Sequence, residues 1–423
     1  MSGYRAQVAM VCPETHLPLT EVSLAGAEAS VAGGGPLRPR PNDTPSPVGP
    51  TPRVLVRDDR ARAYPILDGI PVLLGPEALV PVDQARVVDL TDPRYDEAYR
   101  ELEHYNAVAI DEARDVASSH AARYLAPILR LSERDRGAFP EPRSVWLSAL
   151  HDAAAEWDAF AHFAPLAGKH VMQLGGTGLH AVKFLLAGAA EAWLISPMVG
   201  ELVLTRALAE YAGVGNRLHC AAGVGEAIPV ADETFDAVYT GGCLHHMRTE
   251  IALPEIARVL APGGKFAALD PWRAPLYTLG TKLLGKREEK LIGKREVGVY
   301  CRPMTPARVT PLAQHFDDAR VILHGTLTRY PLIALWKFGI TVPVPIAWYL
   351  NAVDDRLCSL IPGLRAKGSS LALLGTKPPR HAEPHPLPCH AEPPPRHADR
   401  REESASARDV LRTSQTPNGS QPC

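Results

Sequence analysis

Two adjacent histidines and one aspartate are the side chains of this sequence best suited to proton transfer. His245 and His246 follow one short apolar run, and Asp270 ends another. Histidine titrates near neutral pH and can take a proton from an oxygen nucleophile, whereas an aspartate can orient a hydroxyl or an amine. Two plainer roles stay open: one histidine only packs against a ligand or caps the next helix, and Asp270 only ends its strand.

The cysteines do not indicate a metal site or disulfides. Seven are present, irregularly spaced and without a CxxC pair, and no long apolar run opens the chain. An odd number without an export signal favours reduced thiols, so we expect a cytoplasmic protein. Cys243 lies near His245 and His246, but adjacent histidines rarely face one ion and no fourth ligand is evident. We therefore expect no metal.

A glycine-rich turn offers a place for a ligand. The run HVMQLGGTGLHAVKFLLAGA, which begins at His170, reads as an apolar strand, a turn with Gly175, Gly176 and Gly178, and an apolar helix. Glycine lets the backbone turn tightly and approach a ligand without a side chain in the way. The start of the helix adds free N–H groups, so the turn is typical of a small-molecule site.

The elements around this turn alternate between strand and helix. Strands are expected at 191–198, 217–221, 235–239 and 265–270, with helices at 202–211 and 251–260. Such alternation implies a parallel sheet with right-handed crossovers, whose strand ends bind ligands. Two further apolar runs, 319–324 and 370–375, read as strands. We expect the insert Pro271–Phe316 to shape a substrate pocket.

Four motifs in this order resemble the type 11 class of S-adenosylmethionine-dependent methyltransferases. They are Ile228-Pro229-Val230, Phe235-Asp236, Leu244-His245-His246 and Arg258-Val259-Leu260-Ala261-Pro262-Gly263-Gly264. The resemblance spans residues 166–377, about half of the chain. It implies an α/β, Rossmann-like seven-stranded sheet with helices on both faces, in which strands 319–324 and 370–375 form an antiparallel pair at the edge. It also implies S-adenosylmethionine as cofactor and in-line methyl transfer.

The cofactor motifs depart from the pattern of that class. Gln173 stands where the first strand normally ends in an acid, and the acid that grips the ribose is absent near Leu194. The aspartate that reads the adenine would align with Val224. Backbone N–H groups and nearby side chains are expected to take over these roles. The resulting candidate cofactor-binding residues are Gln173, Gly175, Gly176, Gly178, Ser196, Glu226 and Cys243.

Two rival interpretations were weighed against the methyltransferase. The run Gly176–Ala181 also fits the dinucleotide fingerprint GxGxxA, which requires an acid about 20 residues later. Ser196-Pro197-Met198 supplies none, and the RVLAPGG block does not fit a dehydrogenase. The second rival is a catalytically silent binding or scaffold protein with the same fold, which the loss of the usual acids leaves open.

Residues 1–80 resemble the small zinc-ribbon proteins that activate methyltransferases. Cys12-Pro13 and Tyr64–Leu74 match that pattern, whereas Thr15 and Arg57–Arg60 replace the other metal ligands. We therefore predict a degenerate, metal-free segment, in which runs 54–56 and 70–74 form strands joined through a turn at Asp68-Gly69. A low-complexity insert, residues 26–52, is expected to be disordered.

Two apolar stretches flank the predicted sheet domain. Residues 81–165 read as a helical lid or linker, with one helix over Val145–Phe163 whose apolar residues share a face. Pro331–Leu350 is long enough for a membrane span, but its three prolines, glycine and Lys337 favour a buried cap over the substrate pocket. The Pro- and His-rich residues 378–423 are expected to form a disordered tail.

Composition limits the partners. The chain has 423 residues, 46% of them hydrophobic and 22% charged, with a net charge of −2. That balance is typical of a globular protein and indicates no nucleic-acid partner. We expect the substrate to be a small, partly apolar molecule. The oligomeric state is left open.

Overall fold

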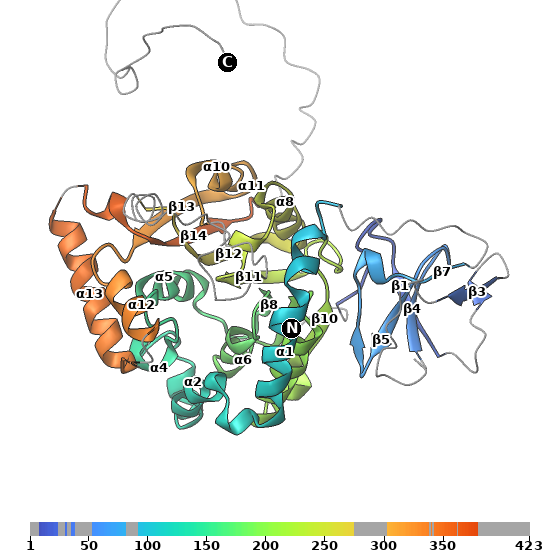
Figure 1. Ribbon diagram of the computed structural model, residues 1–423, viewed down its shortest axis with the longest axis horizontal. Coiled ribbons are helices and arrows are strands. Elements are labelled where there is room, and N and C mark those ends of the chain that lie inside the picture. The colour runs from blue at the N-terminus through green and yellow to red at the C-terminus, as the bar shows by residue number, and fades with distance from the viewer. Residues whose placement is uncertain are drawn as a thin grey trace, which may run out of the picture. The chain divides into compact units, whose positions relative to one another are not determined.

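The computed structural model describes residues 8–23, 30–31, 35–38, 53–81, 92–274, 303–337, 340, 342–361 and 363–379 (Figure 1). The predicted disordered tail, apart from residues 378–379, lies outside these residues. So do most of the low-complexity insert 26–52 and residues 275–302 of the insert that follows the fifth strand.

A seven-stranded sheet forms the centre of the molecule, as predicted. Its order is β10-β9-β8-β11-β12-β14-β13, and β14 runs antiparallel to both of its neighbours. The central strands are apolar and buried along most of their length, as parallel strands covered on both faces must be. The strands are β8 (His170–Leu174), β9 (Glu191–Ser196), β10 (Leu218–Ala222), β11 (Phe235–Gly241), β12 (Leu260–Pro271), β13 (Asp317–His324) and β14 (Ser370–Thr376).

Helices cover both faces of this sheet, which confirms the Rossmann-like arrangement. One face packs against α2, α4, α5, α6 and α7 around Phe160, Phe184 and Tyr239. The other face packs against α8 and α11, with Phe266 stacked on Phe316. These helices are α2 (His120–Leu129), α4 (Arg143–Trp146), α5 (Ala153–Phe163), α6 (Leu179–Leu186), α7 (Val199–Tyr211), α8 (Thr249–Val259) and α11 (Leu312–His315), and shorter ones are α3 (Glu133–Arg136) and α10 (Pro306–Val309).

The predicted single helix over Val145–Phe163 was wrong. The chain leaves α4 at Leu147 in an extended conformation and starts α5 only at Ala153. The break is stabilised by Glu156, whose carboxylate accepts hydrogen bonds from the backbone N–H groups of Ser148 and Ala149 at 2.6 and 2.8 Å. Those bonds replace the helical ones that residues 148 and 149 would otherwise make.

The apolar stretch Pro331–Leu350 divides between two helices. They are α12 (Arg329–Lys337) and α13 (Val344–Leu360), and α13 packs against α4 and α5 beside the sheet (Figure 1). Pro345, the second residue of α13, suits the first turn of a helix, where its missing N–H would have no partner. Among the described residues, no helix is both long and apolar enough to cross a bilayer.

The N-terminal segment is a small antiparallel β structure. A four-stranded sheet has the order β1-β4-β5-β6, and its Asp68-Gly69 turn takes positive φ angles of 48° and 77°. That turn joins β5 to β6, so strand β5 was missed by the sequence prediction. The strands are β1 (Leu19–Ser23), β4 (Arg53–Arg57), β5 (Ala63–Leu67) and β6 (Ile70–Pro71). A second sheet contains β2 (Ser30–Val31), β3 (Gly35–Arg38) and β7 (Val80–Pro81), of which β2 and β3 fall within the insert predicted to be disordered.

The N-terminal segment continues the edge of the central sheet. The Leu73 N–H donates to the Ala222 carbonyl at 2.8 Å, and the Val11 N–H donates to the Pro229 carbonyl at 3.1 Å. Cys12 is fully buried, with its Sγ 3.2 Å from the Tyr64 hydroxyl and 3.7 Å from Nη1 of Arg57. The resemblance to a zinc ribbon stays a prediction.

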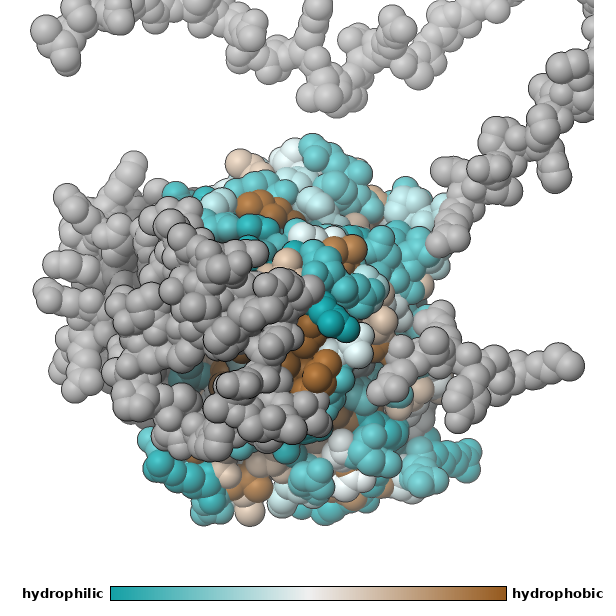
Figure 2. Space-filling view, turned by 90° about the vertical axis from the view of Figure 1, so that its right-hand side faces the viewer, coloured by the Kyte–Doolittle hydropathy of each residue, from teal (hydrophilic) through white to brown (hydrophobic). Residues whose placement is uncertain are grey.

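The long helix α1 (Asp96–Arg114) follows the N-terminal segment (Figure 1). It packs against α7. Its Asn106 side chain accepts a hydrogen bond from the Gly200 N–H at 2.8 Å. Gly200 must stay small, because a Cβ there would meet the backbone of Asn106 at 2.5 Å. Viewed from the side at right angles to Figure 1, the described surface mixes hydrophilic residues with scattered hydrophobic ones (Figure 2).

Candidate functional site

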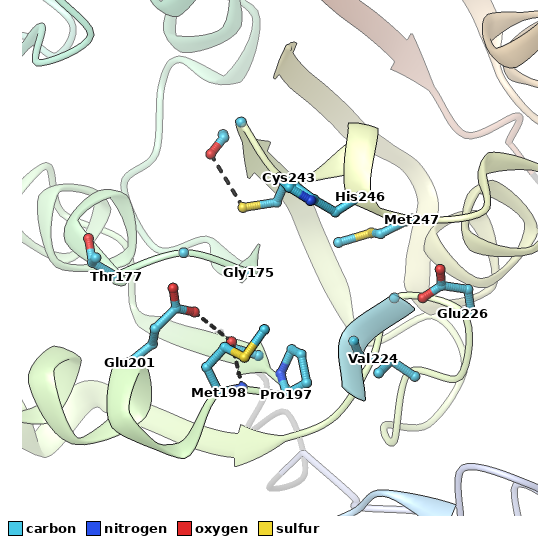
Figure 3. A pocket seen from close by; sticks show the side chains of 16 residues that line it. Gly175, Thr177, Pro197, Met198, Glu201, Val224, Glu226, Cys243, His246 and Met247 are labelled. Atoms are coloured by element: carbon cyan, nitrogen blue, oxygen red, sulfur yellow. Dashed lines mark hydrogen bonds between the residues drawn. The ribbon is translucent and has the colours of Figure 1, made fainter. Parts of the chain in front are cut away.

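A pocket of about 340 Å³ lies at the carboxyl ends of the parallel strands (Figure 3). Each of the four strands β8 to β11 contributes the loop that follows it, and α1 adds one residue from the side. This is where ligands bind in open α/β sheets. The lining residues are Ala98, Gly175, Gly176, Thr177, Ser196, Pro197, Met198, Glu201, Val224, Gly225, Glu226, Gly241, Gly242, Cys243, His246 and Met247.

The glycine-rich turn forms one wall of the pocket. Gly175, Gly176 and Gly178 have φ angles of 75°, 76° and 69°, a region that side chains disfavour. A Cβ on Gly175 would also lie 2.9 Å from Sγ of Cys243. Gly178 does not line the pocket. It is the N-cap of α6, and a Cβ there would collide with the side chain of Thr205.

Gln173 holds the glycine turn from below and does not line the pocket. Its side chain is 2% exposed, and both ends of its amide are used. The Nε2 group donates to the Gly175 carbonyl at 2.8 Å, and Oε1 accepts from the Ala181 N–H at 2.8 Å. A carboxylate could accept but not donate, so this clamp needs an amide. Gln173 and Gly178 are therefore positioning residues.

Glu201 is a pocket residue that the sequence analysis missed. It lies in the first turn of α7, and its Oε2 accepts a hydrogen bond from the Ser196 hydroxyl at 2.7 Å (Figure 3). Ser196 in turn accepts from the Met198 N–H at 3.1 Å. The sequence does show Glu201 as an acidic residue in the first turn of the helix that follows the second strand. It was overlooked because the acid was sought at the end of the strand itself.

The pocket carries two carboxylates. Glu226 lies in the loop after β10, and its Oε1 accepts from the Arg248 N–H at 2.7 Å. Glu226 and Glu201 are 7% and 8% exposed. No lysine or arginine occurs among the described lining residues. The pocket therefore favours a ligand with positive charge.

The candidate catalytic residues occupy two layers. His246 lines the pocket, whereas His245 lies behind it with the two rings 4.0 Å apart. Nδ1 of His245 is 2.7 Å from Oδ1 of Asp270, and the same oxygen accepts from the His245 N–H at 3.0 Å. Neither His245 nor Asp270 is among the residues that line the pocket.

Asp270 is in an environment that disfavours its charge. The side chain is 1% exposed, and its Oδ2 has no hydrogen-bond partner among the described residues. Burial raises the pKa of Asp270 to about 7, against the opposing effect of the His245 N–H. Asp270 and His245 together can therefore hold a proton at neutral pH, directly behind His246.

Comparison with known proteins shows what the central part of this chain is similar to. Residues 174–268 match a family model described as a methyltransferase domain. They include every lining residue of the pocket except Ala98, and the match supports S-adenosylmethionine as the cofactor.

The curated proteins that are similar to this region differ in their named substrates. A tRNA U34 carboxymethyltransferase of Idiomarina loihiensis is 29% identical over 167 residues, which cover 38% of this chain and 50% of the relative. The ubiquinone/menaquinone biosynthesis C-methyltransferase UbiE of Roseobacter denitrificans is 37% identical over 130 residues, 30% of this chain and 48% of the relative. The chain thus spans about half the length of the curated relatives it matches.

Solved structures with a similar chain course include geranyl diphosphate methyltransferases. One in complex with SAM has 14% sequence identity and a TM-score of 0.36, covering 53% of this chain and 84% of that one. Another, from Streptomyces coelicolor A3(2), has 14% identity and a TM-score of 0.37, covering 59% and 85%.

A buried charged network lies next to the glycine turn of the pocket. Glu156 and Lys183 are both 0% exposed, with Oε1 3.4 Å from Nζ, and the same oxygen is 3.0 Å from Nε2 of His180. Burial opposes the charge on Glu156, but Lys183 and His180 outweigh it and hold the pKa of this carboxyl well below its usual range. The network joins α5 to the first turn of α6, directly after the glycine turn.

Proposed function

We propose that the protein is an S-adenosylmethionine-dependent methyltransferase that acts on a small, partly apolar molecule by in-line methyl transfer. The observation that carries the proposal is the pocket at the ends of β8–β11, which combines a glycine turn with two carboxylates and no lysine or arginine among its described lining residues. The matched methyltransferase domain over residues 174–268 supports the same assignment.

The charge of the pocket distinguishes this proposal from dinucleotide binding. A dinucleotide carries a pyrophosphate, which Glu201 and Glu226 would repel. S-Adenosylmethionine, when bound, supplies a methyl group on a positively charged sulfur, which carboxylates favour. Glu201 is the residue best placed to accept hydrogen bonds from the ribose hydroxyls, and the bare backbone of Gly175 and Gly176 would face the amino-acid end.

The chain's own contribution to chemistry centres on His246. It lines the pocket and would take a proton from an oxygen or nitrogen acceptor. His245 and Asp270 orient this group from behind, through the contact of the two tilted imidazole rings and the 2.7 Å contact between Nδ1 of His245 and Oδ1 of Asp270. Alignment of the acceptor supplies the remainder of the rate enhancement, as expected for a displacement reaction.

Calorimetric titration with S-adenosylhomocysteine tests the proposal. We expect micromolar binding, and Glu201→Gln should weaken it about 10- to 100-fold, because a charged hydrogen-bond acceptor is lost. Glu250→Gln is the matched control, since Glu250 lies in the first turn of α8 and is exposed. NADH should not bind.

Two results would contradict the proposal. Absence of heat at millimolar S-adenosylhomocysteine would favour the silent binding or scaffold protein on this fold. Tighter binding of NADH than of S-adenosylhomocysteine would favour the dinucleotide reading of the glycine turn.

A further inference from the structure

A second cavity, also of about 340 Å³, shares no lining residue with the acidic pocket. It is enclosed by α2 on one side, by the break between α4 and α5 on another, and by the insert between β13 and β14. Its lining residues are His120, Arg123, Tyr124, Ser148, Ala149, Leu150, His151, Leu332, Ile340 and Val342.

One side of this cavity is apolar. Leu332, Ile340 and Val342 come from the insert between β13 and β14, and Leu150 faces them from the break before α5. Leu332 is 3% exposed, whereas Ile340 is 53% exposed. The described residues of the apolar stretch Pro331–Leu350 therefore contribute to this cavity and not to the acidic pocket, which this stretch was expected to cover. A hydrocarbon chain is the ligand that such a surface takes up from water.

The other side of the cavity carries positive charge. Arg123 is exposed and makes no hydrogen bond or ion pair with any described residue. His120 lies one turn before it on α2. His151 lines the cavity from the break before α5, and burial lowers the pKa of His151, so its ring is neutral at pH 7. Arg123 is therefore the cation of the cavity.

No carboxylate among the described lining residues offsets this charge. The two acids nearest in sequence to the break are already engaged. Asp152 binds Arg329 at 2.6 Å between Oδ1 and Nε, and Glu156 binds Lys183 and the Ser148 hydroxyl. The charge of this cavity is thus opposite in sign to that of the acidic pocket, which favours ligands of opposite charge at the two places.

We propose that this cavity is a second small-molecule site, which takes an apolar chain bearing one anionic group. Arg123 binds the anion, a carboxylate or a phosphate monoester, and the insert residues cover the chain. The site is independent of the proposed methyl transfer. Ser148 nevertheless links its wall to α6 through Glu156 and His180, with distances of 2.8 and 3.0 Å.

Calorimetry with octanoate, octyl phosphate and octanol tests the site on the full chain. At least one of the two anions should bind about tenfold more tightly than octanol, which corresponds to about 1.4 kcal/mol. The tighter of the two identifies the anionic group. Arg123→Gln should abolish this preference, while Arg134→Gln, an exposed arginine of α3 that does not line the cavity, should leave it unchanged.

A second variant tests the apolar side. Ile340→Asp changes an exposed residue, so it should fold, and it should weaken both the anion and octanol. Equal affinity for octanol and both anions, or wild-type affinity in Arg123→Gln or Ile340→Asp, would overturn the proposal. The same variants are titrated in parallel with S-adenosylhomocysteine. Because the two cavities share no lining residue, loss of anion binding can be told apart from loss of cofactor binding in the acidic pocket.

Discussion

Single residues decide how the pocket is built, and some of their roles could not be predicted from their types. Gln173 was expected to contact the cofactor in place of an acid, yet it clamps the glycine turn from below. Glu201 was missed, although it supplies one of the two carboxylates of the pocket. A sequence position gives the residue type and its element, but the direction of the side chain depends on packing between elements.

Gln173→Leu should destabilise the protein and weaken cofactor binding. The change leaves the Gly175 carbonyl and the Ala181 N–H without partners, which should lower the free energy of unfolding by about 2–4 kcal/mol. Urea denaturation measures this loss. Gln314→Leu, at an exposed position in α11, is the control. Equal stability of the two variants would show that the clamp contributes nothing.

The regular elements of the sheet were predictable, and the helices around it less so. Strands such as β8 and β11 are apolar runs bounded by glycine or polar residues, which a sequence shows directly. The break at residues 147–152 was not visible, because it depends on Glu156 reaching back to two backbone N–H groups. Strand β5 was missed because Pro65 interrupts its apolar pattern.

The stabilising contact of α13 with α5 and β13 should depend on pH, because it contains the buried His324. Its ring is buried between Asp158 of α5 and Asp355 of α13, with both N···O distances 2.8 Å. Burial alone would lower the pKa of His324, but the two carboxylates outweigh it and raise the pKa to about 9. Since the folded value lies above the unfolded one, the stabilisation is complete below about pH 6.5 and is lost as the pH rises through 9.

Unfolding free energies from pH 6 to 10 measure this effect. The wild type should lose on the order of 3 kcal/mol more than His324→Gln over that range. His315→Gln, which lies outside this contact, should follow the wild type. Parallel curves for the wild type and His324→Gln would contradict the assignment.

At the scale of the whole molecule, alternation of strand and helix predicted the parallel part of the sheet, and the resemblance to the methyltransferase class predicted its antiparallel closing pair. Right-handed crossovers restrict the order of parallel strands, and the closing antiparallel pair, β13 and β14, lies at the edge as expected. The junction with the N-terminal segment could not be predicted. It depends on backbone hydrogen bonds such as that from Leu73 to Ala222, which any side chain would permit. The N-terminal segment and the central sheet both belong to one compact unit, Met1–Arg380.

A crystal structure of the chain with S-adenosylhomocysteine tests the central assignment most directly. We predict that the ligand occupies the acidic pocket, with its ribose against Glu201 and its amino-acid end against Gly175 and Gly176. Binding at another place, or a pocket that stays empty at saturating ligand while the glycine turn keeps its conformation, would contradict the account.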